Sequence, residues 1–117
     1  MKLYFYFLDI RKDNCIRMEE CEVEEKAKTY RPTNGFPAGF YHAYVKKDDI
    51  GRLTAFNQNL IILAEKNTDR VAEAFTCRCE YTISREERRI QLAEKEIEQS
   101  KSAIVALEKW RSENAGK

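Results

Sequence analysis

The sequence predicts an α+β protein, in which a small, mostly antiparallel sheet is followed by a helix and a long C-terminal coiled-coil helix. Three observations support this prediction. The first half of the chain consists of short apolar stretches separated by turn-forming segments, which is typical of strands. From residue 85 onward the chain is rich in Glu, Lys, Arg and Gln and has no Gly or Pro until Gly116. Isoleucine also recurs at a regular spacing within this second half.

The first predicted strand covers residues 2–10, where apolar or aromatic side chains occupy both odd and even positions. A strand that is apolar on both faces is expected to lie inside a sheet, so this one is predicted to be central. A turn at residues 11–14 leads to a half-exposed partner strand over residues 15–25. Residues 28–31 either extend this partner or form a short strand of their own.

The middle of the chain alternates between loops and strands. Residues 32–39 contain both prolines and two of the four glycines, so they are predicted to form a loop. Residues 40–45 return to strand propensity, and residues 46–52 form a charged turn. A hairpin is expected between residues 53–56 and 60–64, and the second of these stretches is predicted to be another central strand. The sheet should therefore contain about four to six strands, the usual size of a small sheet.

A helix is predicted from the end of this region. Asn67 or Thr68 is a natural N-cap, and Asp69 suits the positive end of the helix dipole. Ser84 begins a second start signal, because a glutamate follows it three residues later as in a capping box. Both a break near Thr82 and a continuous helix are compatible with the sequence.

The predicted organisation is a sheet domain over residues 1–66, a helical coiled-coil arm over residues 67–113 and a disordered tail over residues 114–117. A chain of 117 residues has enough apolar side chains for one core but not for two. We therefore expect a single domain with a helical extension.

The strongest pattern is a heptad repeat in the arm. Its a positions are isoleucines spaced seven residues apart, and its d positions are mixed. The predicted oligomerisation residues are Ile83, Ile90, Ala93, Ile97, Ser100, Ile104 and Leu107, with Glu86 at the remaining d position. In a parallel pair the g and e positions would give two attractive contacts, Arg89 with Glu94 and Glu96 with Lys101, although an antiparallel mate is also open.

The alternative is that this helix packs against its own sheet. Its length argues against that, because residues 83–111 would span about 42 Å at about 1.5 Å per residue, which is more than a small sheet covers.

Composition excludes several function classes. The net charge of +1 provides no global field toward nucleic acid or an anionic membrane. No apolar run approaches the length of a membrane span, and the N-terminal run lacks the features of an export signal. We therefore expect a soluble cytoplasmic protein with its four cysteines reduced.

Catalysis is not expected. The sequence lacks phosphate-loop, dinucleotide-loop, zinc-protease and serine-nucleophile motifs, and its cysteines do not have metal-ligand spacing. The prediction is a protein that is not an enzyme and that has no cofactor and no metal.

The candidate ligand-binding residues are aromatic, amide and arginine side chains in and beside the loops. Aromatic faces stack on bases, and arginines bind phosphates through paired hydrogen bonds, so the combination suits a nucleotide. These residues are Tyr30, Arg31, Asn34, Phe36, Phe40, Tyr41, His42, Arg52, Phe56 and Asn57. The alternative is that Phe36 and Phe40 cap the edge of the core and that the arginines are merely solvated.

A second basic group lies at the start of the coil. Arg85, Arg88 and Arg89 cluster there, and Arg85 and Arg89 share one helix face. In an oligomer they could close a pocket opened by a loop of a neighbouring copy. As an alternative, they form salt bridges on the helix surface.

The order of aromatic strands, the segments at residues 26–30 and 46–51, an apolar strand and a long charged helix resembles that of small accessory proteins of phages and mobile elements. Within that group the plan is similar to anti-Thoeris sponges, which combine helical arms with β elements and sequester a cyclic ADP-ribose signal. The resemblance implies a pocket made from an aromatic, an amide and two arginines one turn apart. The matching positions here are Phe56 or Phe75, Asn67, Arg85 and Arg89.

The first functional hypothesis is therefore a phage-type anti-defence protein that binds a nucleotide immune signal without turnover and forms a homo-oligomer through its C-terminal helix. The alternative is a protein-binding inhibitor of a host defence complex, similar to an anti-CRISPR, or a coiled-coil scaffold. An exposed apolar stripe favours this alternative, whereas a pocket lined by arginine and aromatic residues favours the first hypothesis.

Overall fold

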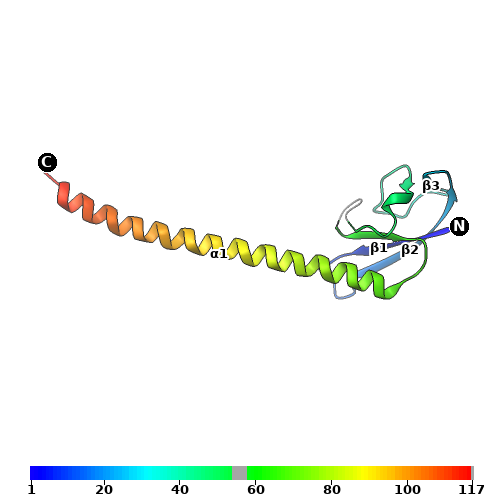
Figure 1. Cartoon of the computed structure of the whole chain (residues 1–117), viewed down its shortest axis with the longest axis horizontal. Helices are drawn as coiled ribbons and strands as arrows, with labels where there is room; N and C mark the ends of the chain where they lie inside the picture. The colour runs from blue at the N-terminus through cyan, green and yellow to red at the C-terminus, as the bar shows by residue number, and fades with distance from the viewer. Residues whose placement is uncertain (54–57, 117) are drawn as a thin grey trace. The chain divides into compact units, whose positions relative to one another are not determined.

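The computed structural model describes residues 1–53 and 58–116. The chain forms two compact units, Met1–Arg78 and Cys79–Lys117. The first unit contains the sheet, and helix α1 (Thr68–Asn114) begins in the first unit and continues through the second without a break (Figure 1).

The first unit is built on one five-stranded sheet with the order β4-β3-β2-β1-β5, and every pairing between neighbouring strands is antiparallel. The elements are β1 (Lys2–Leu8), β2 (Ile16–Glu25), β3 (Thr29–Pro32), β4 (Val45–Lys46), the 3-10 helix η1 (Lys47–Asp49) and β5 (Leu60–Leu63). The predictions of an α+β fold and of a mostly antiparallel sheet are confirmed.

Strand β1 lies inside the sheet, as predicted, because it pairs with β2 on one side and with β5 on the other. Phe5 has Glu19 as its partner on β2 and Ile62 as its partner on β5. Phe5 itself is completely buried. The two-faced apolar pattern of β1 therefore matches an internal position.

Within the described residues, the prediction that residues 60–63 form a second central strand is not met, because β5 is the last of the described strands in the sheet. All four of its residues are nevertheless buried. Leu60 and Ile62 belong to one core cluster, while Ile61 and Leu63 belong to another on the opposite face. The strand is apolar on both sides because both faces of the sheet are covered there. The apolar pattern therefore indicates burial on both faces and does not indicate the position of the strand in the sheet.

The predicted strand at residues 40–45 is also wrong for most of its length, since only Val45–Lys46 is extended and paired. Phe40 instead anchors a loop, where its ring lies 5.2 Å from Phe5 and 4.8 Å from Phe36. Gly39, with a φ of +96°, allows the chain to turn into this position. The predicted hairpin strand at residues 53–56 lies almost wholly outside the described residues.

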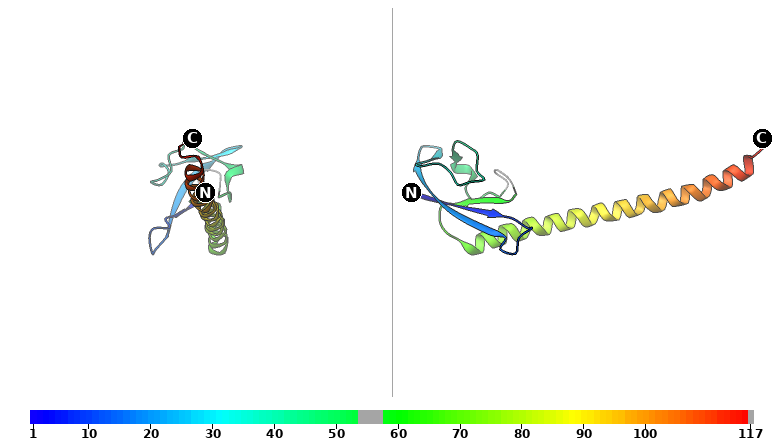
Figure 2. Two further views of the ribbon diagram at one scale, coloured as in Figure 1. Left: turned by 90° about the vertical axis from the view of Figure 1, so that its left-hand side faces the viewer. Right: turned by 180° about the vertical axis from the view of Figure 1, so that it is seen from behind.

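Two apolar clusters stabilise the first unit, one on each face of the sheet. The larger cluster includes Leu3, Phe5 and Phe40, and the loop before β4 contributes to it. The smaller cluster joins Tyr6 of β1 to Phe75 of α1. The first turns of α1 run beside the strands in both Figure 1 and Figure 2, and they cover this second face.

Helix α1 starts as predicted. The backbone N–H of Arg70 donates to the side-chain oxygen of Asn67 over 3.0 Å, and the N–H of Val71 donates to the Asn67 carbonyl over 3.1 Å. Asn67 is therefore the N-cap. The helix continues through Thr82 and Ser84 and ends at Asn114, so the capping-box pattern at Ser84 does not start a new helix. No glycine or proline interrupts this stretch, and nothing in the sequence forces a break.

Candidate functional site

The most distinctive surface of the second unit is an apolar stripe on α1. Its a-position isoleucines Ile83, Ile90, Ile97 and Ile104 are 56%, 56%, 53% and 57% exposed, and Leu107 is 61% exposed. Isolated apolar side chains are common on protein surfaces, whereas these recur at a regular spacing along one helix. We call these five residues the seam.

The seam borders a shallow groove on the helix surface. A hollow of about 430 Å³ is lined by Ala93, Glu96, Ile97, Ser100, Lys101 and Ile104. The small side chains Ala93 and Ser100 leave space between successive isoleucines. Spaces of this kind are able to receive side chains from a second helix, as happens in a coiled coil.

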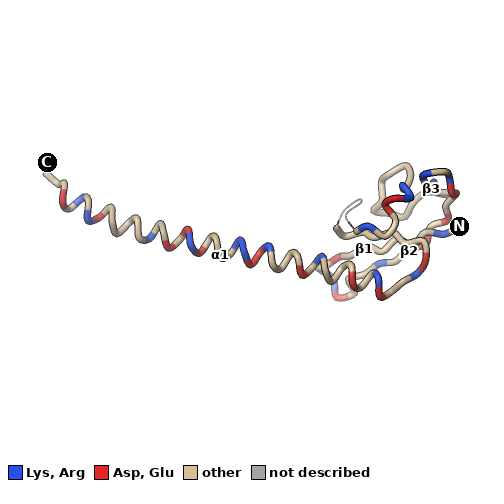
Figure 3. Tube along the Cα trace, viewed as in Figure 1, with Lys and Arg blue, Asp and Glu red and all other residues tan. Residues whose placement is uncertain are grey.

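Charged side chains surround the seam. Every described residue from 87 to 116 is exposed in this chain, and basic and acidic residues alternate along α1 in Figure 3. The side chains of Lys101 and Glu98 approach to 3.8 Å, and those of Lys109 and Glu113 to 3.9 Å. The helix therefore carries the seam on a largely charged surface, and Leu92, Val105 and Trp110 are exposed apolar side chains outside the seam.

The two arginines predicted to bind a ligand share one carboxylate on this helix. Arg85 Nε lies 3.4 Å from a Glu86 oxygen, and Arg89 approaches the other Glu86 oxygen to 3.2 Å. This matches the alternative in which the arginines form surface salt bridges. Exposed ion pairs of this kind are weak, so both guanidinium groups retain donors that could face another molecule.

Three of the predicted aromatic ligand residues are core residues, and one of them is Tyr30 of β3, which is 8% exposed in the larger cluster. Phe40 is 6% exposed and packs in the larger cluster, and Phe75 is 4% exposed in the smaller one. Phe36 packs against the larger cluster as well. The packing of Phe36 and Phe40 therefore matches the alternative in which their rings cap the core.

The remaining candidates lie on separate segments of the first unit. Arg31 of β3 places its guanidinium 5.3 Å from the Tyr44 ring. The ring of His42 lies 5.0 Å from that of Phe40. Arg52 follows η1 and is exposed.

Asn34 and Tyr41 are exposed, and three further candidates complete the set. Asn67 is used as the helix cap, as described above. Phe56 and Asn57 lie outside the described residues.

Sequence reasoning missed a concave site at the turn between β1 and β2. A pocket of about 570 Å³ is lined there by Phe7, Leu8, Asp9, Ile10, Arg11, Lys12, Asn14, Cys15, Arg17 and Asn59. We call it the turn pocket. Its volume is in the range of small-molecule sites, which is about 300 to 1,000 Å³. Its lining combines three basic side chains with the carboxylate of Asp9 and with amide and apolar groups, so the basic groups outnumber the acidic one.

Contacts within the turn pocket fix its shape. The carboxylate of Asp9 accepts hydrogen bonds from the backbone N–H and the side chain of Arg11, at 3.1 and 3.3 Å. The backbone hydrogen bond is the main cause of a lowered pKa of Asp9, so this carboxylate stays ionised. Arg17 lies 4.1 Å from the Phe7 ring and donates to the Ala38 carbonyl over 3.0 Å.

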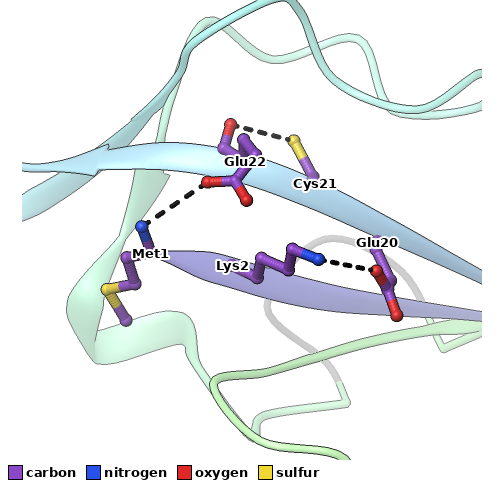
Figure 4. A network of polar contacts seen from close by, with 5 residues as sticks. All are labelled: Met1, Lys2, Glu20, Cys21 and Glu22. Atoms are coloured by element: carbon purple, nitrogen blue, oxygen red, sulfur yellow. Dashed lines mark hydrogen bonds and ion pairs between the residues drawn. The ribbon is translucent and has the colours of Figure 1, made fainter.

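The acidic residues of β2 form ion pairs along the strand. Lys2 lies 3.2 Å from one oxygen of Glu20, and the N-terminal amine lies 3.5 Å from Glu22 (Figure 4). Lys66 lies 3.2 Å from the other oxygen of Glu20. The hydrogen bond from Lys2, followed by that from Lys66, lowers the pKa of Glu20. These contacts give the acidic residues a structural role.

Cys21 sits in this strand as a buried thiol. It contacts the Gly35 carbonyl at 3.5 Å, and burial raises its pKa. The thiol is therefore protonated and poorly reactive. Among the described residues, no group of three or more His, Cys, Asp or Glu side chains lies close enough together to hold a metal ion.

No family model, curated protein or solved structure matches the chain. In the parts of the chain that the structure describes, no helix has the length and apolar character needed to cross a membrane. Function is therefore inferred from the seam and from the turn pocket.

Proposed function

We propose that the protein is a self-assembling scaffold that forms a homo-oligomer through the seam and carries its sheet unit as the binding module. The observation that supports this is the row of isoleucines at heptad spacing, each more than half exposed in the single chain. It acts by binding, without turnover.

The energetics favour burial of the seam. Complete burial of an isoleucine stabilises by roughly 1.5 to 3 kcal/mol, so burying the exposed half of each side chain contributes about 1 kcal/mol. The isoleucines and Leu107 of two chains together would supply about 10 kcal/mol, which is comparable with the estimated cost of about 4 to 15 kcal/mol for association. Charged residues beside the seam then select the partner.

The test is the mass of the full chain in solution, measured by sedimentation equilibrium. We expect a multiple of the chain mass for the wild type and the chain mass for Ile97→Asp, because a carboxylate buried in the seam has no partner. Ser102→Asp introduces the same charge at the outer f position and should leave the oligomer intact. A monomeric wild type, or equal effects of both substitutions, would contradict self-assembly through the seam.

Sequestration of a nucleotide signal is a second candidate function, and the turn pocket favours it. Arg11, Lys12 and Arg17 place cationic groups around a hollow of about 570 Å³, and Phe7 and Ile10 add apolar surface. Phosphate binding through charge-assisted hydrogen bonds, with a base against the apolar part, suits this lining. This is the chemistry that an anti-defence protein needs when it withdraws a nucleotide signal.

Calorimetric titration with cyclic dinucleotides and cyclic ADP-ribose isomers tests this second function. Lys12→Ala should weaken binding, whereas Lys26→Ala, which removes a lysine paired with Glu24 outside the pocket, should not. If the wild type binds none of these nucleotides, or if both variants bind as the wild type does, the turn pocket has no such role.

A further inference from the structure

We propose that the seam joins two copies of this chain as a parallel, in-register, two-stranded coiled coil. This inference rests on the self-assembly proposed above, and it adds the number of chains, their direction and the residues that meet.

Charge complementarity across the seam supports the parallel direction. In a parallel pair each g residue faces the e residue five positions later on the other helix. Arg89 then meets Glu94 of the second copy, and Glu96 meets Lys101 of the second copy. Each contact occurs twice by symmetry, and no g and e pair along the seam brings like charges together.

An antiparallel pair is less favourable, because e positions then face e positions. These residues are Glu87, Glu94, Lys101 and Glu108, so three of the four are acidic. Any antiparallel alignment that uses at least three of them brings at least one glutamate opposite another glutamate. Like charges in such contacts destabilise a coiled coil and select against that alignment.

The seam residues support two strands. A β-branched isoleucine at each a position favours a parallel dimer when d carries leucine, and Leu107 supplies leucine at one d position. Ala93 and Ser100 at d are small, which allows two helices to approach closely. Glu86 is the unfavourable d residue, but Arg85 and Arg89 of its own helix already hold it at 3.4 and 3.2 Å.

The parallel direction has a consequence for binding. The sheet unit of each chain joins the helix at Arg78, so two chains that run in the same direction carry both sheet units at the same end of the coil. A partner with two sites could then engage both copies at once, which raises its apparent affinity through effective concentration.

Two serine-to-cysteine variants provide a matched test. Ser100 is a d residue and faces its own counterpart in a parallel, in-register pair, whereas Ser102 is at f and points away. Both side chains are exposed in the single chain. The variants are made in a full-length background with Cys77→Ser and Cys79→Ser, oxidised mildly, and compared by non-reducing electrophoresis and peptide mass spectrometry.

We expect Ser100→Cys to give a covalent dimer linked through position 100 in most of the chains, and Ser102→Cys to remain at the level of the background. A charge exchange tests the pairing of the two helices independently, in the chain that keeps its native cysteines. Glu96→Lys should weaken association about tenfold by replacing attractive surface pairs with repulsive ones. Adding Lys101→Glu should restore it, because positions 96 and 101 meet only between helices.

Sedimentation equilibrium of the reduced samples separates the outcomes. A dimer mass without the position-100 cross-link, or without rescue by Lys101→Glu, overturns the parallel register while self-assembly stands. A trimer or tetramer mass overturns the two-stranded form. A monomer mass overturns both this inference and the proposed self-assembly.

Discussion

Truncation of one seam residue should weaken association by an amount that follows from its exposure. Full burial of the carbon atoms that Ile97→Ala removes contributes about 2.4 kcal/mol, at about 0.8 kcal/mol per methylene. Because 53% of Ile97 is exposed before association, the loss is about 1.3 kcal/mol per chain and about 2.5 kcal/mol per pair. The dissociation constant of a dimer should therefore rise about 70-fold.

Sedimentation equilibrium over a range of concentrations measures this constant. Leu92→Ala is the matched control, because Leu92 is 60% exposed on the same helix but occupies a c position outside the seam. Its dissociation constant should change by less than about threefold, the range of ordinary surface substitutions. An equal effect of both substitutions, or a threefold effect of Ile97→Ala, would refute the assignment of Ile97 to a buried layer.

Three further predictions concern the first unit. Phe75→Ala should destabilise it by about 3 to 5 kcal/mol in urea unfolding, because Phe75 is 4% exposed in its core. Asn67→Ala should lower the melting temperature, at a cost of about 1 kcal/mol for the lost N-cap. Lys2 and Lys66 depress the pKa of Glu20 below its ordinary 4.5. The Glu20 carboxylate therefore stabilises the folded state above pH 4.5, and this stabilisation is lost as the pH falls through the folded-state pKa. Glu20→Gln should therefore flatten acid unfolding curves below about pH 5, whereas unchanged curves would exclude this linkage.

Sequence patterns predicted most of the sheet, because strand formation and helix capping depend largely on residues that are close together in the sequence. The strands β1 and β2 follow from apolar alternation, and the N-cap at Asn67 follows from the chemistry of its side chain. Strand order was predicted less well. Strand β5 is apolar on both faces because two clusters cover it, and the same composition would result from a central position.

The candidate site was harder to predict than the fold. An aromatic residue next to a glycine-rich loop suits either a ligand or a core, and only the packing of Phe40 on Phe5 distinguishes the two. The turn pocket escaped detection for a different reason. Its lining is one stretch, residues 7–17, together with Asn59, and the residue types of a short charged turn do not indicate whether the turn folds around a hollow. The heptad assignment stays a prediction until the mass of the protein in solution is known.

The pairing of β1 has a consequence for the order in which the nascent chain can fold. Its partner β2 follows at once, so the hairpin closes a short loop, but β5 reaches the other side of β1 only after the chain has been synthesised to Leu63. Closing the longer loop costs more entropy and is expected to be the slower step. Until then β1 has an unpaired edge beside aromatic side chains, which is a template for wrong pairing between chains. Chains that stop before residue 60 should therefore aggregate during synthesis.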